Sequence, residues 1–134
     1  MKPATLAHLK GIITRFAGNG RRLGYPTANL TTATDLKDGV YFGLADLAAY
    51  ANHPALIFVG TPTTMGDTTR RIEAYLLDIP DQDYYGQELR LNVQYFHRPN
   101  QTFASVDDLL VAMKADETTA RQWFQDHPSA KPNK

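Results

Sequence analysis

The chain has 134 residues and no cysteine, and its 14 basic side chains balance its 14 acidic ones. This length predicts one domain, large enough for a hydrophobic core and too small for two ordinary domains. The absence of cysteine excludes disulfides and thiolate metal sites, and the zero net charge argues against a general nucleic-acid or anionic-membrane binder. With no signal peptide and no apolar run of membrane-spanning length, we expect a cytoplasmic protein that acts as a monomer.

A weakly alternating strand is expected over residues 5–14, and a loop rich in glycine and arginine follows it. The glycines let the backbone approach a ligand closely, and the arginines add charge suited to phosphate oxygens. A polyanion is therefore the natural ligand of this loop. The apolar positions of the strand are Leu6, Leu9, Ile12 and Ile13, and the loop residues are Gly18, Gly20, Arg21, Arg22 and Gly24.

Directly after the loop, Pro26 stiffens a turn that carries two candidate metal ligands, Thr27 and Asn29. A hydroxyl and an amide oxygen are hard, neutral ligands of the kind that hold Mg²⁺ when a nucleotide supplies the remaining charge. The alternative interpretation is a solvated connection in which these two side chains bond the local backbone. The pattern matches neither the P-loop nor the dinucleotide fingerprint, so the residues alone leave both interpretations open.

Four more strands are expected, over residues 40–47, 54–59, 70–79 and 88–95. A second loop, made of glycine and small hydroxylated residues, spans 60–67. The last two strands alternate cleanly between their two faces. In the first of these, Ile72, Ala74 and Leu76 share one face and Glu73, Tyr75 and Leu77 the other, while the second places Leu89, Leu91, Val93 and Tyr95 together.

Beyond residue 104 the hydrophobic period becomes helical. Ser105 and Asp108 form an expected capping box, and a second helical segment carries Trp123, which we expect in the core and not as a stacking platform for a ligand. Residues 1–127 are expected to form one domain, followed by a disordered tail over 128–134. The other apolar positions at helical spacing are Val106, Leu109, Leu110, Met113, Ala120 and Phe124.

Five or six short strands followed by one helical unit predict an α+β domain dominated by antiparallel sheet. In so short a chain, closure into a small barrel is an economical way to remove the sheet edges. We therefore expect a mainly β fold, a closed barrel with the C-terminal helices packed over it.

Glu73 is the ionisable residue that its position singles out, in the middle of a strand between Ile72 and Ala74. Such a carboxylate can simply face solvent. It becomes a candidate base if its face of the sheet points toward the glycine-rich loop, because an ionised Glu can orient or accept the proton of an attacking hydroxyl. The four histidines lack metal-ligand spacing, and Ser105 and Ser129 lie at a helix cap and in the tail, so neither a zinc enzyme nor a serine hydrolase is expected.

An ordered set of motifs runs through nearly the whole chain. It comprises Gly11, Gly20-Arg21, Leu23-Gly24-Tyr25-Pro26-Thr27-Ala28-Asn29-Leu30, Gly39-Val40-Tyr41, Gly60-Thr61, Arg71-Ile72-Glu73, Leu76-Leu77-Asp78, Tyr85-Gly86, Arg98, Phe103, Leu109 and Asp116. This set resembles riboflavin kinase. In bacteria such a domain is usually the C-terminal half of a two-domain protein that also makes FAD, and only the kinase half is implied here.

The resemblance implies a closed six-stranded antiparallel Greek-key barrel with a C-terminal helix, which transfers the γ-phosphate of ATP to the 5′-hydroxyl of riboflavin and gives FMN. Glu73 would act as the base, Thr27 and Asn29 would hold Mg²⁺, and Arg98 and Phe103 would bind the flavin. The alternative is a module of the same fold that binds flavin or nucleotide with little or no turnover. In both cases the partners of the protein would be small molecules, and neither nucleic acid nor a membrane is expected to bind. The implied nucleotide-binding residues are Gly18, Gly20, Arg21, Gly24, Pro26 and Thr27.

Four positions depart from the pattern of the family. Phe16 stands in place of a glycine, Asn19 in place of a basic residue and Asn100 in place of a glutamate, and Pro62 comes one position early in the second loop. We therefore expect the phosphate and flavin loops to differ in shape from those of the family.

Overall fold

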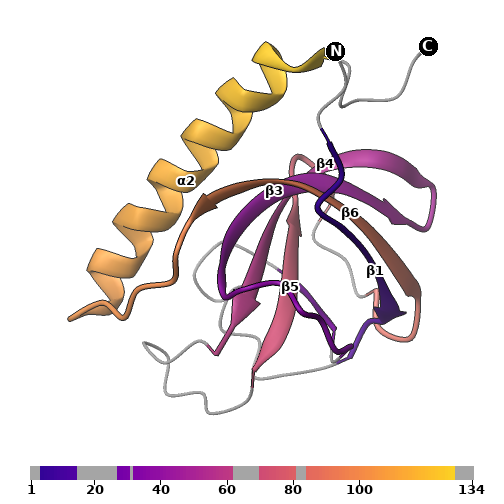
Figure 1. Ribbon diagram of the computed structural model, residues 1–134, viewed down its shortest axis with the longest axis horizontal. Coiled ribbons are helices and arrows are strands. Elements are labelled where there is room, and N and C mark those ends of the chain that lie inside the picture. The colour runs from indigo at the N-terminus through magenta and orange to yellow at the C-terminus, as the bar shows by residue number, and fades with distance from the viewer. Residues whose placement is uncertain (1–3, 15–26, 31, 62–69, 81–83, 129–134) are drawn as a thin grey trace.

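The computed structural model describes residues 4–14, 27–30, 32–61, 70–80 and 84–128 (Figure 1). Within these residues the chain forms six strands followed by a long helix. The elements are β1 (Ala7–Ile12), β2 (Ala28–Leu30), β3 (Gly39–Leu47), β4 (Tyr50–Gly60), β5 (Arg71–Leu76), β6 (Glu88–Arg98) and α2 (Val106–Asp126). No helix in this part of the chain is long and apolar enough to cross a membrane.

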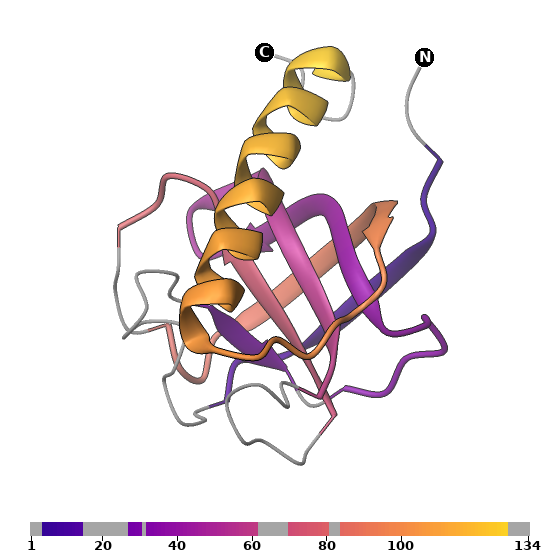
Figure 2. The same ribbon diagram turned by 90° about the vertical axis from the view of Figure 1, so that its left-hand side faces the viewer.

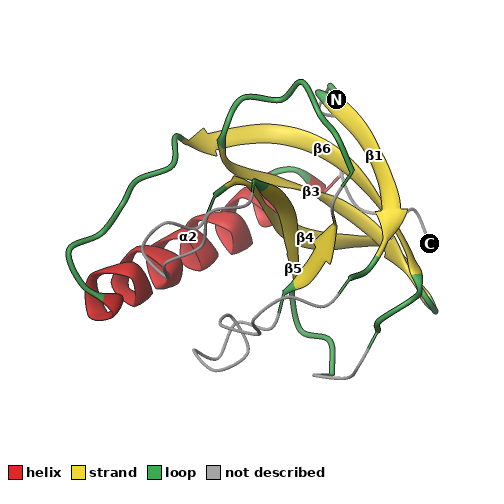
Figure 3. Ribbon diagram, turned by 90° about the horizontal axis from the view of Figure 1, so that it is seen from below, coloured by secondary structure: helices red, strands yellow, loops and turns green. Residues whose placement is uncertain are grey.

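The six strands form one antiparallel sheet in the order β1-β6-β3-β4-β5-β2. The sheet curves around an interior, as the view from below shows (Figure 3). Two residues beyond the end of β1, Thr14 forms an isolated bridge to β2, in which the Thr14 amide donates to the Asn29 carbonyl at 2.9 Å. The expected closed barrel is therefore wrong in one respect, since the described residues form an open half-barrel.

The inner face of the half-barrel carries the main core. Every strand contributes, because side chains that alternate along a strand all reach the same face. Ile72, Ala74 and Leu76 share one face of β5, as predicted, and that face points inward, where they are at most 5% exposed. The inner cluster also contains Leu9, Leu30, Tyr41, Ala45, Leu47, Ala55, Ile57, Val59, Leu89, Leu91 and Val93.

The outer face of the sheet is covered by α2 (Figure 2). Ser105 caps this helix, with its hydroxyl accepting the Asp108 amide at 3.1 Å, so the predicted cap is confirmed. The two helical segments expected from the sequence form one continuous helix. Trp123 is 9% exposed and packs in the outer core, as predicted. That outer cluster comprises Val40, Phe42, Leu44, Leu56, Leu77, Ala120, Trp123 and Phe124.

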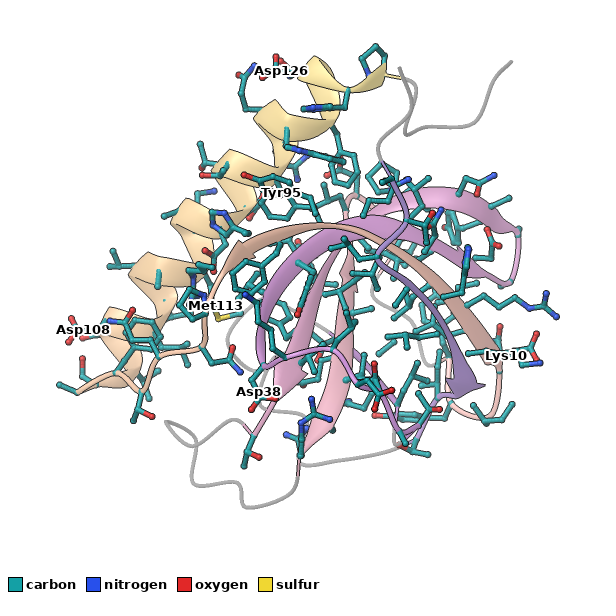
Figure 4. The ribbon with its side chains drawn as sticks, viewed as in Figure 1. Lys10, Asp38, Tyr95, Asp108, Met113 and Asp126 are labelled. Carbon is teal, nitrogen blue, oxygen red and sulfur yellow. The ribbon has the colours of Figure 1, made fainter. Side chains whose placement is uncertain are left out.

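Two expectations about the strands are wrong. Asn29 lies in β2 and is 7% exposed, whereas the sequence places it in a loop or turn. Tyr95 leaves the face of Val93 because the register shifts between β3 and β6, and its ring packs against Trp123 at 5.5 Å beside α2 (Figure 4). A β-bulge of this kind inserts an extra residue, which breaks the alternation that the sequence suggests.

Candidate functional site

Five side chains form a row across the outer face of the sheet. Residues directly opposite each other in antiparallel strands share a face, so the register connects them one strand at a time. Across β2, β5, β4, β3 and β6 the partners are Asn29, Glu73, Phe58, Val40 and Arg98. Strands lie about 4.8 Å apart, so the row runs roughly 19 Å along the sheet. It joins the candidate metal ligand and base at one end to a candidate flavin residue at the other.

The Glu73 carboxylate is held between a hydroxyl and a guanidinium. Thr27 Oγ1 donates to Glu73 Oε1 at 3.0 Å, and Arg71 Nε lies 3.9 Å from Glu73 Oε2. The Arg71 side chain is 5% exposed and that of Glu73 is 20% exposed. Glu73 therefore does not simply face solvent. It lies on the same face as Asn29, so the structure brings Thr27, Asn29 and Glu73 together.

The side-chain amide oxygen of Asn29 is a hydrogen-bond acceptor to which no described residue donates. Its Nδ2 donates to the Thr27 carbonyl at 3.4 Å, while its Oδ1 is buried and has no hydrogen-bond partner. A buried unpaired oxygen is unusual and fits a ligand such as a cation. Thr27 Oγ1 donates its proton to Glu73 and keeps its lone pairs, which suits the same role. These two oxygens therefore fit Mg²⁺.

The described residues supply little negative charge for a metal ion. Within them no three His, Cys, Asp or Glu side chains come together as a metal site would require. Two neutral oxygens and one carboxylate would bind a divalent cation weakly without further anions. Phosphate groups of a nucleotide are suited to complete such a site.

The other end of the row is an ion-pair cluster between β6 and α2. Arg98 makes two hydrogen bonds to Asp116, from Nε to Oδ1 at 2.8 Å and from Nη2 to Oδ2 at 2.7 Å. Its Cζ lies 5.9 Å from the centre of the Phe103 ring. His97 Nε2 is 3.0 Å from Asp116 Oδ1. The structure thus brings the two expected flavin residues together, and places them apart from Glu73.

Two residues beyond Glu73 on β5, Tyr75 lies on the same face of the sheet, opposite Leu56 of β4. Tyr75 packs against the outer cluster. Burial first, and then the Glu117 carboxylate, raise the pKa of the Tyr75 phenol above its ordinary value. Tyr75 therefore stays protonated at neutral pH and is no candidate base.

Several expected residues fall outside the described part of the chain. These are Gly18, Gly20, Arg21, Gly24 and Pro26 of the first loop, together with Phe16, Asn19 and Pro62. The fourth departure, Asn100, is described. Its Nδ2 donates to the Val59 carbonyl at 2.7 Å, beside Gly60 at φ +147°, so this amide ties the segment after β6 to the end of β4.

Two residues of the site had no role assigned from the sequence. Arg71 could have been noticed because it shares the face of Glu73 two positions away, although an arginine in a strand usually faces water. Asp116 belongs to the motif set. It is the one acidic residue of α2 that is buried, and its exposed fraction is 2%. A charged residue at an inward helical position was the available signal.

A carboxylate, a hydroxyl and an unpaired amide oxygen at one edge of the sheet are groups that a phosphotransfer site can use to orient a hydroxyl and to hold a metal ion. The family model described as Flavokinase, riboflavin kinase, matches residues 5–124. The chain therefore belongs to the riboflavin kinase family.

Curated relatives agree with this assignment. The chain is 34% identical to the bifunctional riboflavin kinase/FMN phosphatase of Arabidopsis thaliana over 86% of its length, and spans 32% of that protein. It is 26% identical to the riboflavin kinase of Homo sapiens over 84% of its length, and spans 77% of that protein. The chain thus spans about a third of the Arabidopsis protein and most of the human one.

Solved structures show a similar fold. A chain from Streptococcus pneumoniae, titled a macrolide-efflux protein, superposes with a TM-score of 0.74 at 32% identity, over 90% of this chain and 40% of that one. The riboflavin kinase of Trypanosoma brucei superposes with a TM-score of 0.66 at 22% identity, over 88% of this chain and 79% of that one.

Proposed function

We propose that this chain is a riboflavin kinase, which transfers the γ-phosphate of ATP to the 5′-hydroxyl of riboflavin and gives FMN and ADP. Family membership supports the substrates. The observation that carries the proposal is the Glu73 carboxylate, fixed by the Thr27 hydroxyl at 3.0 Å beside the unpaired Asn29 oxygen. A base, a hydroxyl and an amide oxygen at one strand edge are the parts that this reaction requires from the protein.

In the proposed reaction, Glu73 orients the ribityl hydroxyl and accepts its proton. The hydroxyl oxygen forms a bond to the γ-phosphorus while the bond from that phosphorus to the bridging oxygen breaks, and ADP leaves with the electron pair. Thr27 and Asn29 would hold Mg²⁺, which neutralises charge on the phosphates. Because such a transition state is loose, positioning and electrostatic stabilisation contribute more than covalent chemistry.

The remaining parts of the proposal concern the loops and the whole protein. We expect the first loop to wrap the phosphates through Gly18, Gly20, Arg21, Gly24 and Pro26. Residues 1–127 would act as one domain with a disordered tail, as a monomer in the cytoplasm. The zero net charge supports small molecules as its partners.

The direct test incubates the purified chain with riboflavin, ATP and Mg²⁺ and measures FMN by chromatography. Glu73→Gln keeps the shape of the side chain and removes the base, so we expect kcat to fall about 10² to 10⁴-fold with riboflavin and MgATP binding nearly unchanged.

Glu88→Gln is the matched control, because Glu88 is also a strand carboxylate beside an arginine, with Arg90 Nε at 2.8 Å, but is exposed. It should leave kcat at the parent value. A Glu73→Gln variant with parent turnover would remove Glu73 as the base. Riboflavin binding without any FMN would favour the alternative, a binding module.

A further inference from the structure

Asp116 is a charged residue buried where α2 meets the sheet. Its side chain is 3% exposed, and its two carboxylate oxygens take Arg98 Nε, Arg98 Nη2 and His97 Nε2. His97 in turn stacks on Phe42, with ring centroids 4.8 Å apart. The carboxylate is therefore held from two sides by residues of β6, and through His97 it is anchored to the outer core.

Helix attachment alone does not explain this buried charge. Replacing a buried ion pair by packed apolar residues is often neutral or stabilising, so such a pair is weak evidence for a purely structural role. The same helix is also attached by a second pair, in which Arg121 Nη1 and Nη2 each donate to an Asp78 oxygen at 2.9 Å. The buried pair is therefore better explained by what it does to the Arg98 side chain than by the attachment of α2.

The contacts of Arg98 determine what it can offer a ligand. Nε and one N–H of Nη2 are taken by Asp116, and Nη1 donates to the Pro99 carbonyl at 3.1 Å. The side-on fork with which arginine commonly grips a carboxylate or phosphate is thus occupied. One N–H on each of Nη1 and Nη2 and the flat face of the guanidinium remain, and the Arg98 Cζ lies 5.9 Å from the centre of the Phe103 ring. A planar cationic face suits a planar heteroaromatic ring.

We propose that Asp116 is a positioning residue for the flavin, an inference that rests on the proposed function. It orients the Arg98 guanidinium so that its face, and not its fork, is presented to the isoalloxazine ring of riboflavin. Asp116 itself does not touch the substrate. The consequence is that changes on α2 alter the affinity for riboflavin through Arg98, while the phosphate end of the row is unaffected.

The test measures riboflavin affinity by quenching of its fluorescence and KM by FMN formation. Asp116→Asn frees Arg98 from its charged partner. Displacement of a binding group by about 1 Å can lower activity by up to about 10²-fold. We expect the riboflavin Kd and KM to rise about 10-fold or more, with the ATP KM unchanged. Arg98→Met and the double variant Arg98→Met/Asp116→Asn should bind riboflavin equally weakly, because Asp116 acts only through Arg98, and the double variant leaves no lone charge buried.

Asp78→Asn is the matched control, since it breaks the other pair that attaches α2. Asp78 has φ 60°, a conformation that asparagine also tolerates. This variant should bind riboflavin like the parent. Parent-like riboflavin affinity in Asp116→Asn, or an equal loss in Asp78→Asn, would overturn the inference.

A measurement without substrate separates this inference from the proposed function. The Arg98 Nε–H should exchange slowly in the parent and rapidly in Asp116→Asn, as seen by ¹⁵N NMR, and equal exchange would overturn the positioning. A parent chain that binds riboflavin but makes no FMN would refute the kinase while leaving the Asp116 comparison intact. A parent that binds no riboflavin would overturn both.

Discussion

The unpaired oxygen of Asn29 predicts that one substitution has little effect on stability but weakens ligand binding. Its Oδ1 is buried without a donor, and a buried unsatisfied acceptor costs about 1–3 kcal/mol. Its Nδ2 makes a long bond of 3.4 Å to the Thr27 carbonyl, so little is lost when it is removed. Asn29→Ala should therefore change the free energy of unfolding by less than about 1 kcal/mol in either direction, although Asn29 is a buried strand residue.

The ligand-bound protein should respond differently. If Oδ1 is a ligand of Mg²⁺, Asn29→Ala loses a metal contact, and we expect MgATP to bind at least about 10-fold more weakly, which corresponds to about 1.4 kcal/mol. Unfolding by urea, with and without MgATP, measures both quantities on one sample, since a ligand that binds only the folded state adds to its stability.

Asn92→Ala provides a matched control. Asn92 lies on β6 and also has a buried Oδ1 without a partner, but it is opposite His8 and Leu44, far along the sheet from Glu73. It should show a similarly small stability change with unchanged MgATP affinity. Parent-like MgATP binding in Asn29→Ala would refute the assignment of Asn29. A loss of stability clearly above about 1 kcal/mol would refute the reasoning from the unpaired oxygen.

Three further predictions concern stability. Gly60→Ala should destabilise the fold by about 1–3 kcal/mol, because φ of residue 60 is +147° and an added Cβ would lie 2.1 Å from Asn100 Nδ2. Adding Asn100→Ala removes this clash but not the backbone strain. Chemical denaturation of the double variant should therefore show only partial recovery of stability. Ser105→Ala removes the cap of α2 and should cost about 1 kcal/mol, seen as a lower Tm. The hydrogen bond from Arg121 holds the pKa of Asp78 below its ordinary 3.8, so the ionised form stabilises the fold above that pH and the contribution is lost as pH falls through the lowered value. Because this pair is largely exposed, Asp78→Asn should be less stable than the parent by about 0.2–1 kcal/mol at pH 7, and urea titrations should show this gap narrowing as the pH falls below 3.8; a gap independent of pH would contradict this.

The sequence by itself determined the elements whose side chains repeat regularly. The alternation around Glu73 identifies β5 and the residues that share each of its faces, and the helical spacing after Ser105 identifies α2. These patterns are local, because a period of two or of 3.6 residues follows from backbone geometry alone. The ordered motifs also lead from the sequence to the riboflavin kinase family.

Only the tertiary structure decided what depends on pairing between distant strands. β2 is three residues long, and its strand conformation comes from the ladder with β5, which no local pattern reveals. The bulges that turn Tyr95 toward Trp123 arise from the register of β6 against β3. Within the described residues β1 and β2 form no ladder with each other, so the half-barrel remains open. The row from Asn29 to Arg98 likewise exists only once four strand registers are set. The burial of Asp116 against Arg98 depends in addition on the docking of α2. Both are contacts between residues far apart in sequence, which depend on the whole fold.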